Sequence, residues 1–208
     1  RRADRATRLR GGRWGGMRWI VFLLLAGCLA PIEPPPAAAP PPRTGAAPDL
    51  DGLDRRIAEA ANDARQRRDI EPLAWRADLA AVARGHSRDM GRRGYFDHVS
   101  PDGDSAQDRA RAGEVVCEIP LPGRTRVGVG ENLFLTSRYR GYSERTAGGR
   151  VTRTYDWFAQ DELADRTVDS WLDSPGHRRN LLDPVSRAQG VGVAVGTDDR
   201  IYITQVLC

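Results

Sequence analysis

Residues 94–103 of the chain read Gly94-Tyr95-Phe96-Asp97-His98-Val99-Ser100-Pro101-Asp102-Gly103. The first residue of this stretch closes a strongly periodic helical pattern, and glycine is the usual residue just after a helix C-terminus. The last three residues form a Pro-Asp-Gly turn, because proline presets φ and glycine accepts a positive φ. The stretch therefore predicts a helix end followed by a turn that carries the imidazole of His98.

Two later stretches bring chemistry that complements this imidazole. Gly130-Glu131-Asn132-Leu133 supplies a carboxylate, and residues 171–182 supply a second imidazole, His177. We expect the three stretches to meet in one site, with His98, Glu131 and His177 close together.

The residues before the first stretch predict two helices. Apolar residues recur at helical spacing from Leu50 to Ala64, and a Glu-Pro pair then forces an extended connection. The second helix has Asp78 as its expected cap and ends at Gly91 or Gly94. His86 lies on the apolar stripe of this helix, so we interpret it as a hydrogen-bonded core residue rather than a ligand.

The region after the His98 turn is less regular. Ser105 is predicted to cap a short helix, and residues 114–130 are predicted to be a loop that enters a short strand. Residues 136–160 mix arginine with aromatic residues, a composition able to stack nucleic-acid bases. We favour a solvated loop or hairpin there, long enough to overhang the site as a lid.

A third helix is predicted from Asp161 to Asp173, followed by a new helix start. There Ser174 is the expected N-cap and Pro175 the first helical residue, which explains the serine without nucleophilic chemistry. In residues 191–207, apolar residues recur at every second position on either side of a turn, and this pattern predicts a hairpin in an antiparallel sheet.

The charge of the chain is misleading at first sight. The net charge is +4, and every basic residue is arginine. Residues 1–27 hold seven arginines against Asp4, a local balance of +6, so the remainder carries −2. We therefore expect no nucleic-acid partner, since phosphate binding needs a basic surface on the folded domain.

The N-terminal part predicts export. The sequence begins with arginine, so residues 1–16 are interpreted as a non-native or misassigned extension. Residues 17–28 resemble a lipoprotein signal peptide whose lipobox ends at Cys28, the expected lipidation site, with a plain cleaved signal as the alternative. The apolar run is too short to span a bilayer. Residues 29–49 are rich in proline and alanine and are expected to be an extended linker to a domain over residues 50–208.

The two remaining cysteines, Cys117 and Cys208, suggest one disulfide in an oxidising compartment. Two unrelated thiols are the alternative, because spacing alone does not show proximity.

The order of these pieces resembles a known family, the CAP superfamily (also called SCP domains) in its bacterial branch. Five motifs carry the resemblance: residues 94–103, 130–132, 171–182, 190–194 and 202–205. It implies an α+β fold, a three-layer α-β-α sandwich with a small antiparallel sheet and a surface cleft.

In the eukaryotic branch that cleft carries two histidines and two glutamates able to hold a divalent metal. His98 and Glu131 match the first of each, whereas Ser174 and Tyr202 stand where the second pair is expected. His177 is characteristic of the bacterial pattern. The predicted cleft therefore consists of His98, Glu131, Asn132, Ser174, His177 and Tyr202.

We expect a cell-envelope-tethered or secreted binding module, monomeric, for an extracytoplasmic glycan, peptide or lipid, anchored to the membrane through Cys28. The first alternative is a peptidase-like hydrolase dependent on a divalent metal such as zinc, held by His98, Glu131 and His177, although no His-Glu-x-x-His spacing supports it. The second is a structural envelope protein with a vestigial cleft. No cofactor or catalytic residue is assigned with certainty, and the binding module is preferred over an enzyme because no convincing nucleophile is present.

Overall fold

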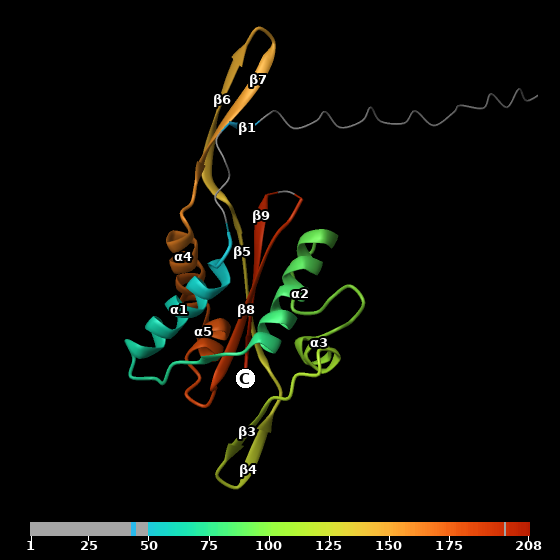
Figure 1. Cartoon of the computed structure of the whole chain (residues 1–208), viewed down its shortest axis with the longest axis vertical. Helices are drawn as coiled ribbons and strands as arrows, with labels where there is room; N and C mark the ends of the chain where they lie inside the picture. The colour runs from blue at the N-terminus through green and yellow to red at the C-terminus, as the bar shows by residue number, and fades with distance from the viewer. Residues whose placement is uncertain (1–42, 45–49, 198) are drawn as a thin grey trace, which may run out of the picture. The chain divides into compact units, whose positions relative to one another are not determined.

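A four-stranded sheet forms the central layer of the computed structural model, in the order β2-β8-β9-β5 (Figure 1). The short strand β2 (Ala74–Trp75) lies parallel to β8 (Ala188–Val195). The strand β9 (Arg200–Leu207) lies between β8 and β5 (Gly130–Ser137) and is antiparallel to both. The predicted C-terminal hairpin is therefore confirmed.

Helices cover both faces of this sheet (Figure 1). One face is covered by α1 (Leu53–Gln66), α4 (Gln160–Asp173) and α5 (Pro175–Leu181), and the other by α2 (Ala77–Arg93) and α3 (Ala106–Ala112). The expected α+β three-layer sandwich is confirmed.

The structure describes residues 43–44, 50–197 and 199–208. The expected extension, the signal peptide with Cys28, and most of the linker lie outside these residues. Within the described residues, no helix is both long enough and apolar enough to cross a membrane.

Close packing of α2 on the sheet depends on two glycines of β8. A Cβ atom at Gly190 would lie 2.0 Å from the backbone nitrogen of Ala80, and one at Gly192 would lie 2.0 Å from that of Arg84. Real atoms do not approach this closely, so only glycine lets the helix backbone rest on the strand.

The outer edge of β5 is covered by side chains from the α4–α5 face. Trp171 donates its indole N–H to the carbonyl of Leu133 at 3.0 Å, and Asn180 donates to the carbonyl of Glu131 at 3.0 Å. These bonds satisfy edge carbonyls that would otherwise be unpaired. They also fix α5 beside the first residues of β5.

The helix starts differ in detail from the prediction. The N-cap of α2 is Arg76, and Asp78 lies in the first turn, where its carboxylate accepts from Arg76 at 3.1 Å. The prediction that Asp78 is the N-cap was therefore wrong, because the extended backbone that an N-cap requires occurs two residues earlier, at Arg76. Ser105 caps α3 with a full capping box, and Gly94 ends α2, as expected.

Two hairpins extend from opposite ends of the body (Figure 1). The first, β3 (Glu118–Leu121) with β4 (Arg124–Val127), replaces the predicted loop, whose Pro-Gly pair at residues 122–123 is the turn. The second, β6 (Tyr139–Ala147) with β7 (Arg150–Trp157), confirms the hairpin interpretation. The short strand β1 (Arg43–Thr44) pairs with β7 in parallel.

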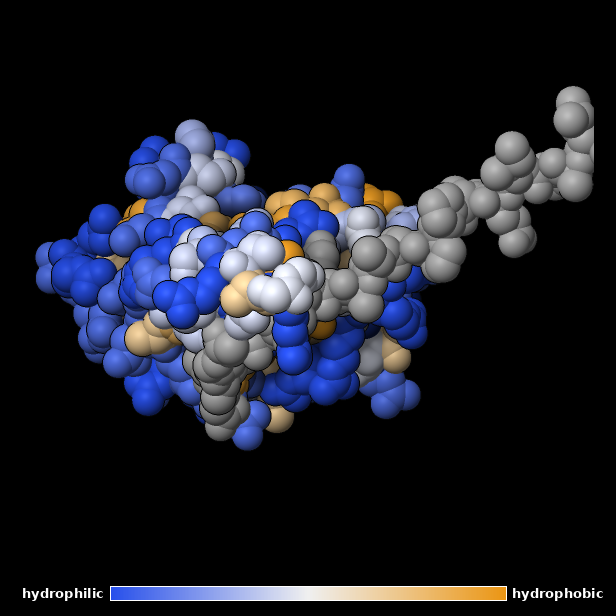
Figure 2. Space-filling view, turned by 90° about the horizontal axis from the view of Figure 1, so that it is seen from above, coloured by the Kyte–Doolittle hydropathy of each residue, from blue (hydrophilic) through white to orange (hydrophobic). Residues whose placement is uncertain are grey.

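The lid interpretation of residues 136–160 was wrong. Glu131 lies at the beginning of β5, whereas the second hairpin continues from the other end of that strand. Ser137 lies six positions after Glu131 along the extended strand, a length of about 20 Å at ~3.3 Å per residue. The hairpin therefore points away from the site. Seen from the hairpin end, the surface is mostly hydrophilic, with hydrophobic residues in small areas (Figure 2).

The predicted disulfide is present between Cys117, just before β3, and Cys208, with the two Cα atoms 5.5 Å apart. It joins the first hairpin to the C-terminal end of β9.

Candidate functional site

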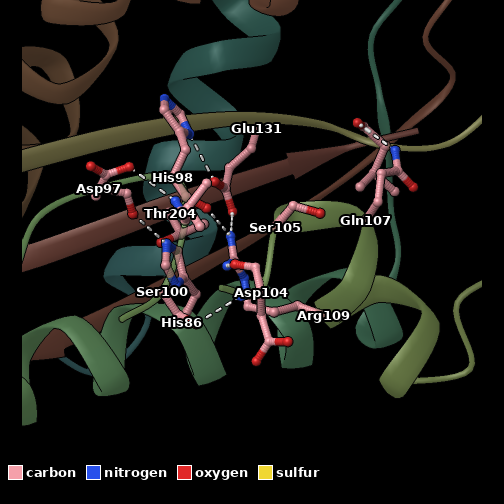
Figure 3. A network of polar contacts seen from close by, with 12 residues as sticks. His86, Asp97, His98, Ser100, Asp104, Ser105, Gln107, Arg109, Glu131 and Thr204 are labelled. Carbon is pink, nitrogen blue, oxygen red and sulfur yellow. Dashed lines mark hydrogen bonds and ion pairs between the residues drawn. The ribbon is translucent and has the colours of Figure 1, made fainter. Parts of the chain in front are cut away.

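Glu131 is the centre of the site. Its side chain is 3% exposed, and each of its carboxylate oxygens has a cationic or proton-bearing partner. Nδ1 of His98 lies 2.8 Å from Oε1, and Nη2 of Arg109 donates to Oε2 at 2.8 Å (Figure 3). A buried carboxylate is stable only when it is paired in this way.

The loop that carries His98 is held by the same arginine. Arg109 donates to the carbonyl of His98 at 3.0 Å and to the carbonyl of Asp104 at 2.7 Å. It can do so because Ser105 starts α3 and places Arg109 one turn along that helix, facing back toward the loop. Arg109 therefore fixes both the carboxylate and the backbone of its imidazole partner.

His86 supports the loop from α2, below His98 (Figure 3). It is 1% exposed, and its Nε2 lies 3.0 Å from the carbonyl oxygen of Asp97. Burial holds the pKa of His86 below its ordinary value, so the ring is neutral and donates its Nε2–H to this carbonyl. The interpretation of His86 as a hydrogen-bonded core residue is confirmed.

His177 reaches the site from the other side of the sheet. It lies on α5, and its ring centroid is 6.0 Å from that of His98. Asn132 donates to the backbone carbonyl of His177 at 3.2 Å, and Asn180 donates to Oδ1 of Asn132 at 3.1 Å. Two asparagines thus hold the helix that carries the second imidazole.

The protonation of the two imidazoles differs. The hydrogen bond to Glu131 holds the pKa of His98 above its ordinary value, whereas burial and then the charge of His98 hold the pKa of His177 below it. The His98 side chain is 51% exposed, and its Nε2 has no hydrogen-bond partner among the described residues. His98 can therefore offer a proton, or a lone pair when neutral, to a molecule outside the protein.

The residues present do not fit the metal site expected from His98, Glu131 and His177. No group of three or more His, Cys, Asp or Glu side chains in the described part of the chain could hold a metal ion. Glu131 uses one oxygen for His98 and the other for Arg109, and the guanidinium opposes a second cation beside it. The metal-ligand interpretation of these three residues is therefore not supported.

The other predicted cleft residues have different positions. Tyr202 is 1% exposed and packs with Met90 and Leu133, so it lies in the core and not beside the imidazoles. The prediction that Tyr202 lines the cleft was therefore wrong. The reason is the strand register, because β9 pairs Tyr202 with Leu135, four residues beyond Glu131. Ser174 is the N-cap residue of α5, as expected, although its hydroxyl makes no capping hydrogen bond.

Asn132 belongs to the site as a support. It is fully buried between β5 and α5 and has no surface for a ligand. Arg109 and Asn180 were missed by the sequence analysis. The signals were their positions, four residues after the Ser105 cap and three residues after His177, which put each on the helix face turned toward Glu131.

Comparisons with known proteins agree with this architecture. The family described as "CAP: Cysteine-rich secretory protein family" matches residues 58–207. Two curated relatives from Bacillus subtilis are the uncharacterized membrane protein YlbC, 30% identical over 152 residues, and the uncharacterized protein YkwD, 26% identical over 149 residues. The matches cover 73% and 72% of this chain but only 33% and 45% of the relatives, so the chain spans less than half of their length.

Solved structures show the same fold. An extracellular protein containing an SCP domain from Bacillus anthracis is 29% identical, with a TM-score of 0.52 over 76% of this chain and 40% of that one. An outer surface protein of Borrelia burgdorferi is 15% identical, with a TM-score of 0.53 over 78% of this chain and 96% of that one. The second likeness concerns the fold alone.

Proposed function

Because the chain belongs to the cysteine-rich secretory protein (CAP) family, we propose that its domain is an extracytoplasmic binding module. In this proposal His98 and His177 contact the ligand beside the covered outer edge of β5. The domain works as a monomer in the cell envelope, tethered through Cys28, or in secreted form. The extracellular SCP-domain protein of Bacillus anthracis supports this location.

The observation that carries the proposal is the chain of contacts from Arg109 through Glu131 to His98. A buried carboxylate that accepts from Nδ1 fixes the tautomer and the orientation of an imidazole. The opposite edge of the His98 ring then faces outward in one orientation. A side chain held this firmly and yet half exposed is suited to recognition, because little rotamer entropy remains to be lost on binding.

The two imidazoles define the chemistry of recognition. His98, whose pKa is raised by Glu131, donates a charge-assisted hydrogen bond to a ligand oxygen. The neutral His177 nearby donates or accepts a second hydrogen bond. A charge-assisted bond of this kind is shorter and stronger than a neutral one. The ligand is thus expected to carry an anionic or hydroxyl oxygen.

A hydrolase receives less support. The Glu131–His98 pair has the arrangement of a general base with its orienting carboxylate, and this favours a metal-independent reaction over a metal-dependent one. However, within the described residues no serine, threonine or cysteine side chain is hydrogen-bonded to the His98 ring, whose one side-chain partner is Glu131. The binding module remains the better account.

The test is co-sedimentation of the purified full chain with isolated peptidoglycan sacculi, and with liposomes of phosphatidylglycerol and phosphatidylcholine in a parallel series. We expect the wild type to bind one of the two, and the His98→Ala variant to bind it at least fivefold more weakly. Arg145→Ala, an exposed change on the distant hairpin, serves as the control and is expected to bind as the wild type does.

Two outcomes would overturn the proposal. Wild-type protein that remains in the supernatant with both materials would favour a structural role with a vestigial cleft. Equal binding by the wild type and by a folded His98→Ala/His177→Ala double variant would show that the imidazoles do not contact the ligand.

A further inference from the structure

The edge of the central sheet opposite β5 is covered by a strand only at one end. The short strand β2 pairs with Ala188 and Gln189, the first two residues of β8. From Gly190 to Val195, β8 has a strand neighbour on one side alone within the described chain, and this neighbour is β9. The outer side of these residues is therefore a sheet edge.

The backbone hydrogen bonds show which groups of β8 point to this edge. Ala188 exchanges two backbone hydrogen bonds with Cys208, at 2.8 and 2.9 Å, so the even-numbered residues of β8 face β9. The carbonyl of Gln189 instead accepts from the backbone N–H of Arg76 at 2.9 Å, on the side away from β9. The same outward direction recurs at every second residue, which here means Val191, Val193 and Val195.

The first part of this edge is closed by an ion pair between two helices. Arg84 of α2 donates to the carboxylate of Asp54 of α1 at 2.8 Å. Because the two helices cover opposite faces of the sheet, this pair passes across the edge at β8. The backbone of Arg84 rests on Gly192, so the pair covers the edge near Val191, which is fully buried.

Beyond this ion pair the edge is open. Val193 is partly buried and Val195 is 42% exposed. The backbone N–H and C=O groups of both valines have no hydrogen-bond partner in the part of the chain that the structure describes. Outward groups of this kind repeat every ~7 Å along a strand and are a template for a further strand. A peptide backbone carries a donor and an acceptor at the same spacing, whereas an acyl chain carries neither.

A groove of about 620 Å³ runs beside the open edge, between α2 and the end of β8. Its volume lies within the ~300–1,000 Å³ that is usual for ligand pockets. Gly85 is in its helical wall, where nothing lies within 4 Å of a Cβ atom, and Ala194 faces it from the sheet. A strand added at the edge would direct every second side chain to this face of the sheet and so into the groove.

The groove carries a positive charge. Arg88 lines it and has no ion-pair or hydrogen-bond partner within the described residues. Asp89 also lines it, but its carboxylate already accepts from Arg92 at 2.7 Å and from the hydroxyl of Tyr95 at 2.8 Å. The three charged residues, two arginines and one aspartate, leave a net charge of +1. An acidic side chain complements this charge, because Arg88 offers a guanidinium that no other group uses.

We propose that the open edge of β8, at Val193 and Val195, binds an extended acidic peptide segment of another protein. The segment adds a strand to the central sheet through backbone hydrogen bonds and places a carboxylate side chain beside Arg88. This site is separate from the imidazoles of the proposed function and does not depend on them.

The test is titration of the purified full chain with a blocked hexapeptide of alternating valine and glutamate, followed by amide chemical shifts and hydrogen exchange. We expect the amides of Val193 and Val195 to exchange at least tenfold more slowly in the complex. The same peptide N-methylated at every residue keeps the side chains but has no N–H donor, and it should not bind.

The first pair of variants separates the backbone from the side chain. Val195→Pro removes an N–H that points outward, and proline is tolerated at such edge positions, so the pairing with β9 is kept. We expect Val195→Pro to weaken binding of the hexapeptide at least tenfold. Val195→Thr keeps the backbone donor and nearly the same shape, and it should bind within twofold of the wild type.

The second pair tests the charge. Arg88→Glu should weaken binding at least tenfold, whereas Arg124→Glu, an equally exposed change on the β3–β4 hairpin, should not. A hexapeptide of alternating valine and lysine should bind at least tenfold more weakly than the glutamate peptide. Equal binding of the two peptides would overturn the acidic partner.

Three further outcomes would overturn the site itself. They are no binding of the glutamate peptide, binding that leaves hydrogen exchange at Val193 and Val195 unchanged, and equal affinity of Val195→Pro and Val195→Thr.

Discussion

At the scale of single residues, folding raises the pKa of His98 and so links the charge of this ring to the stability of the protein. Glu131 accepts from its ring, Asp97 adds a favourable charge and Arg109 an opposing one, with the net result that the pKa of His98 is raised. A raised pKa in the folded state stabilises the protein below the unfolded pKa of about 6.5. This contribution is lost as the pH rises through the folded pKa of His98.

We predict that Glu131→Gln lowers the pKa of His98 toward its ordinary value, because a neutral amide no longer favours the imidazolium. The measurement is an NMR pH titration of the His98 ring, accompanied by the pH dependence of the free energy of unfolding. Asp102→Asn is the control, since Asp102 lies in the same loop but pairs with Arg93. Identical titration of His98 in Glu131→Gln and the wild type would contradict the assignment.

A second prediction concerns His86 as a support for the site. His86→Leu removes the donor to the carbonyl of Asp97 and leaves that carbonyl without its partner. We expect a loss of about 1–3 kcal/mol in the free energy of unfolding, the usual cost of one unsatisfied buried group. The chemical shifts of the His98 ring should also change, because its loop loses an anchor.

Ser87→Ala is the matched control for His86. Ser87 is also buried on α2, but it donates to the carbonyl of Gly192, away from the loop. Its loss should lower stability without changing the shifts of His98. Unchanged shifts of His98 in His86→Leu would limit His86 to a role in packing.

At the scale of elements, the contact between α2 and β8 decides whether the site exists, because α2 carries the loop of His98 into place. Gly190→Ala would put a Cβ atom 2.0 Å from the backbone nitrogen of Ala80. Backbone atoms cannot rotate away as a side chain can, so we expect the upper end or more of the ~1–3 kcal/mol cost of overpacking. Urea denaturation measures this cost.

Gly85→Ala, in the helix α2 that packs on Gly190, gives the comparison. Nothing lies within 4 Å of a Cβ atom at Gly85. Alanine is favoured over glycine in a helix interior, so this variant should gain about 0.5–1 kcal/mol. Equal effects of the two substitutions would mean that α2 does not rest on β8 as described.

At the scale of the whole molecule, the disulfide joins residues 91 apart in sequence and closes most of the described chain into a loop. We predict that Cys117→Ser/Cys208→Ser loses about 2–4 kcal/mol of unfolding free energy, mainly through a less constrained unfolded chain. The wild type in reductant should match the variant in denaturant melts. A wild-type midpoint unaffected by full reduction would refute this contribution.

The fold follows from local signals that the sequence displays openly. Helical spacing defined α1, α2 and α4, alternation defined β8 and β9, and turn residues located the His98 loop. These signals depend on neighbours a few positions apart, and so they are visible without any tertiary contact. The β3–β4 hairpin was missed because its strands are short and do not alternate between apolar and polar residues.

The composition of the site was only partly visible in the sequence. The sequence by itself determined the three motifs and the expectation that His98, Glu131 and His177 meet. Only the tertiary structure decided that Arg109 occupies the second oxygen of Glu131 and that Tyr202 is buried elsewhere. The physical reason is that a partner's identity depends on strand register and on which helix faces a strand, and residues far apart in the chain set both.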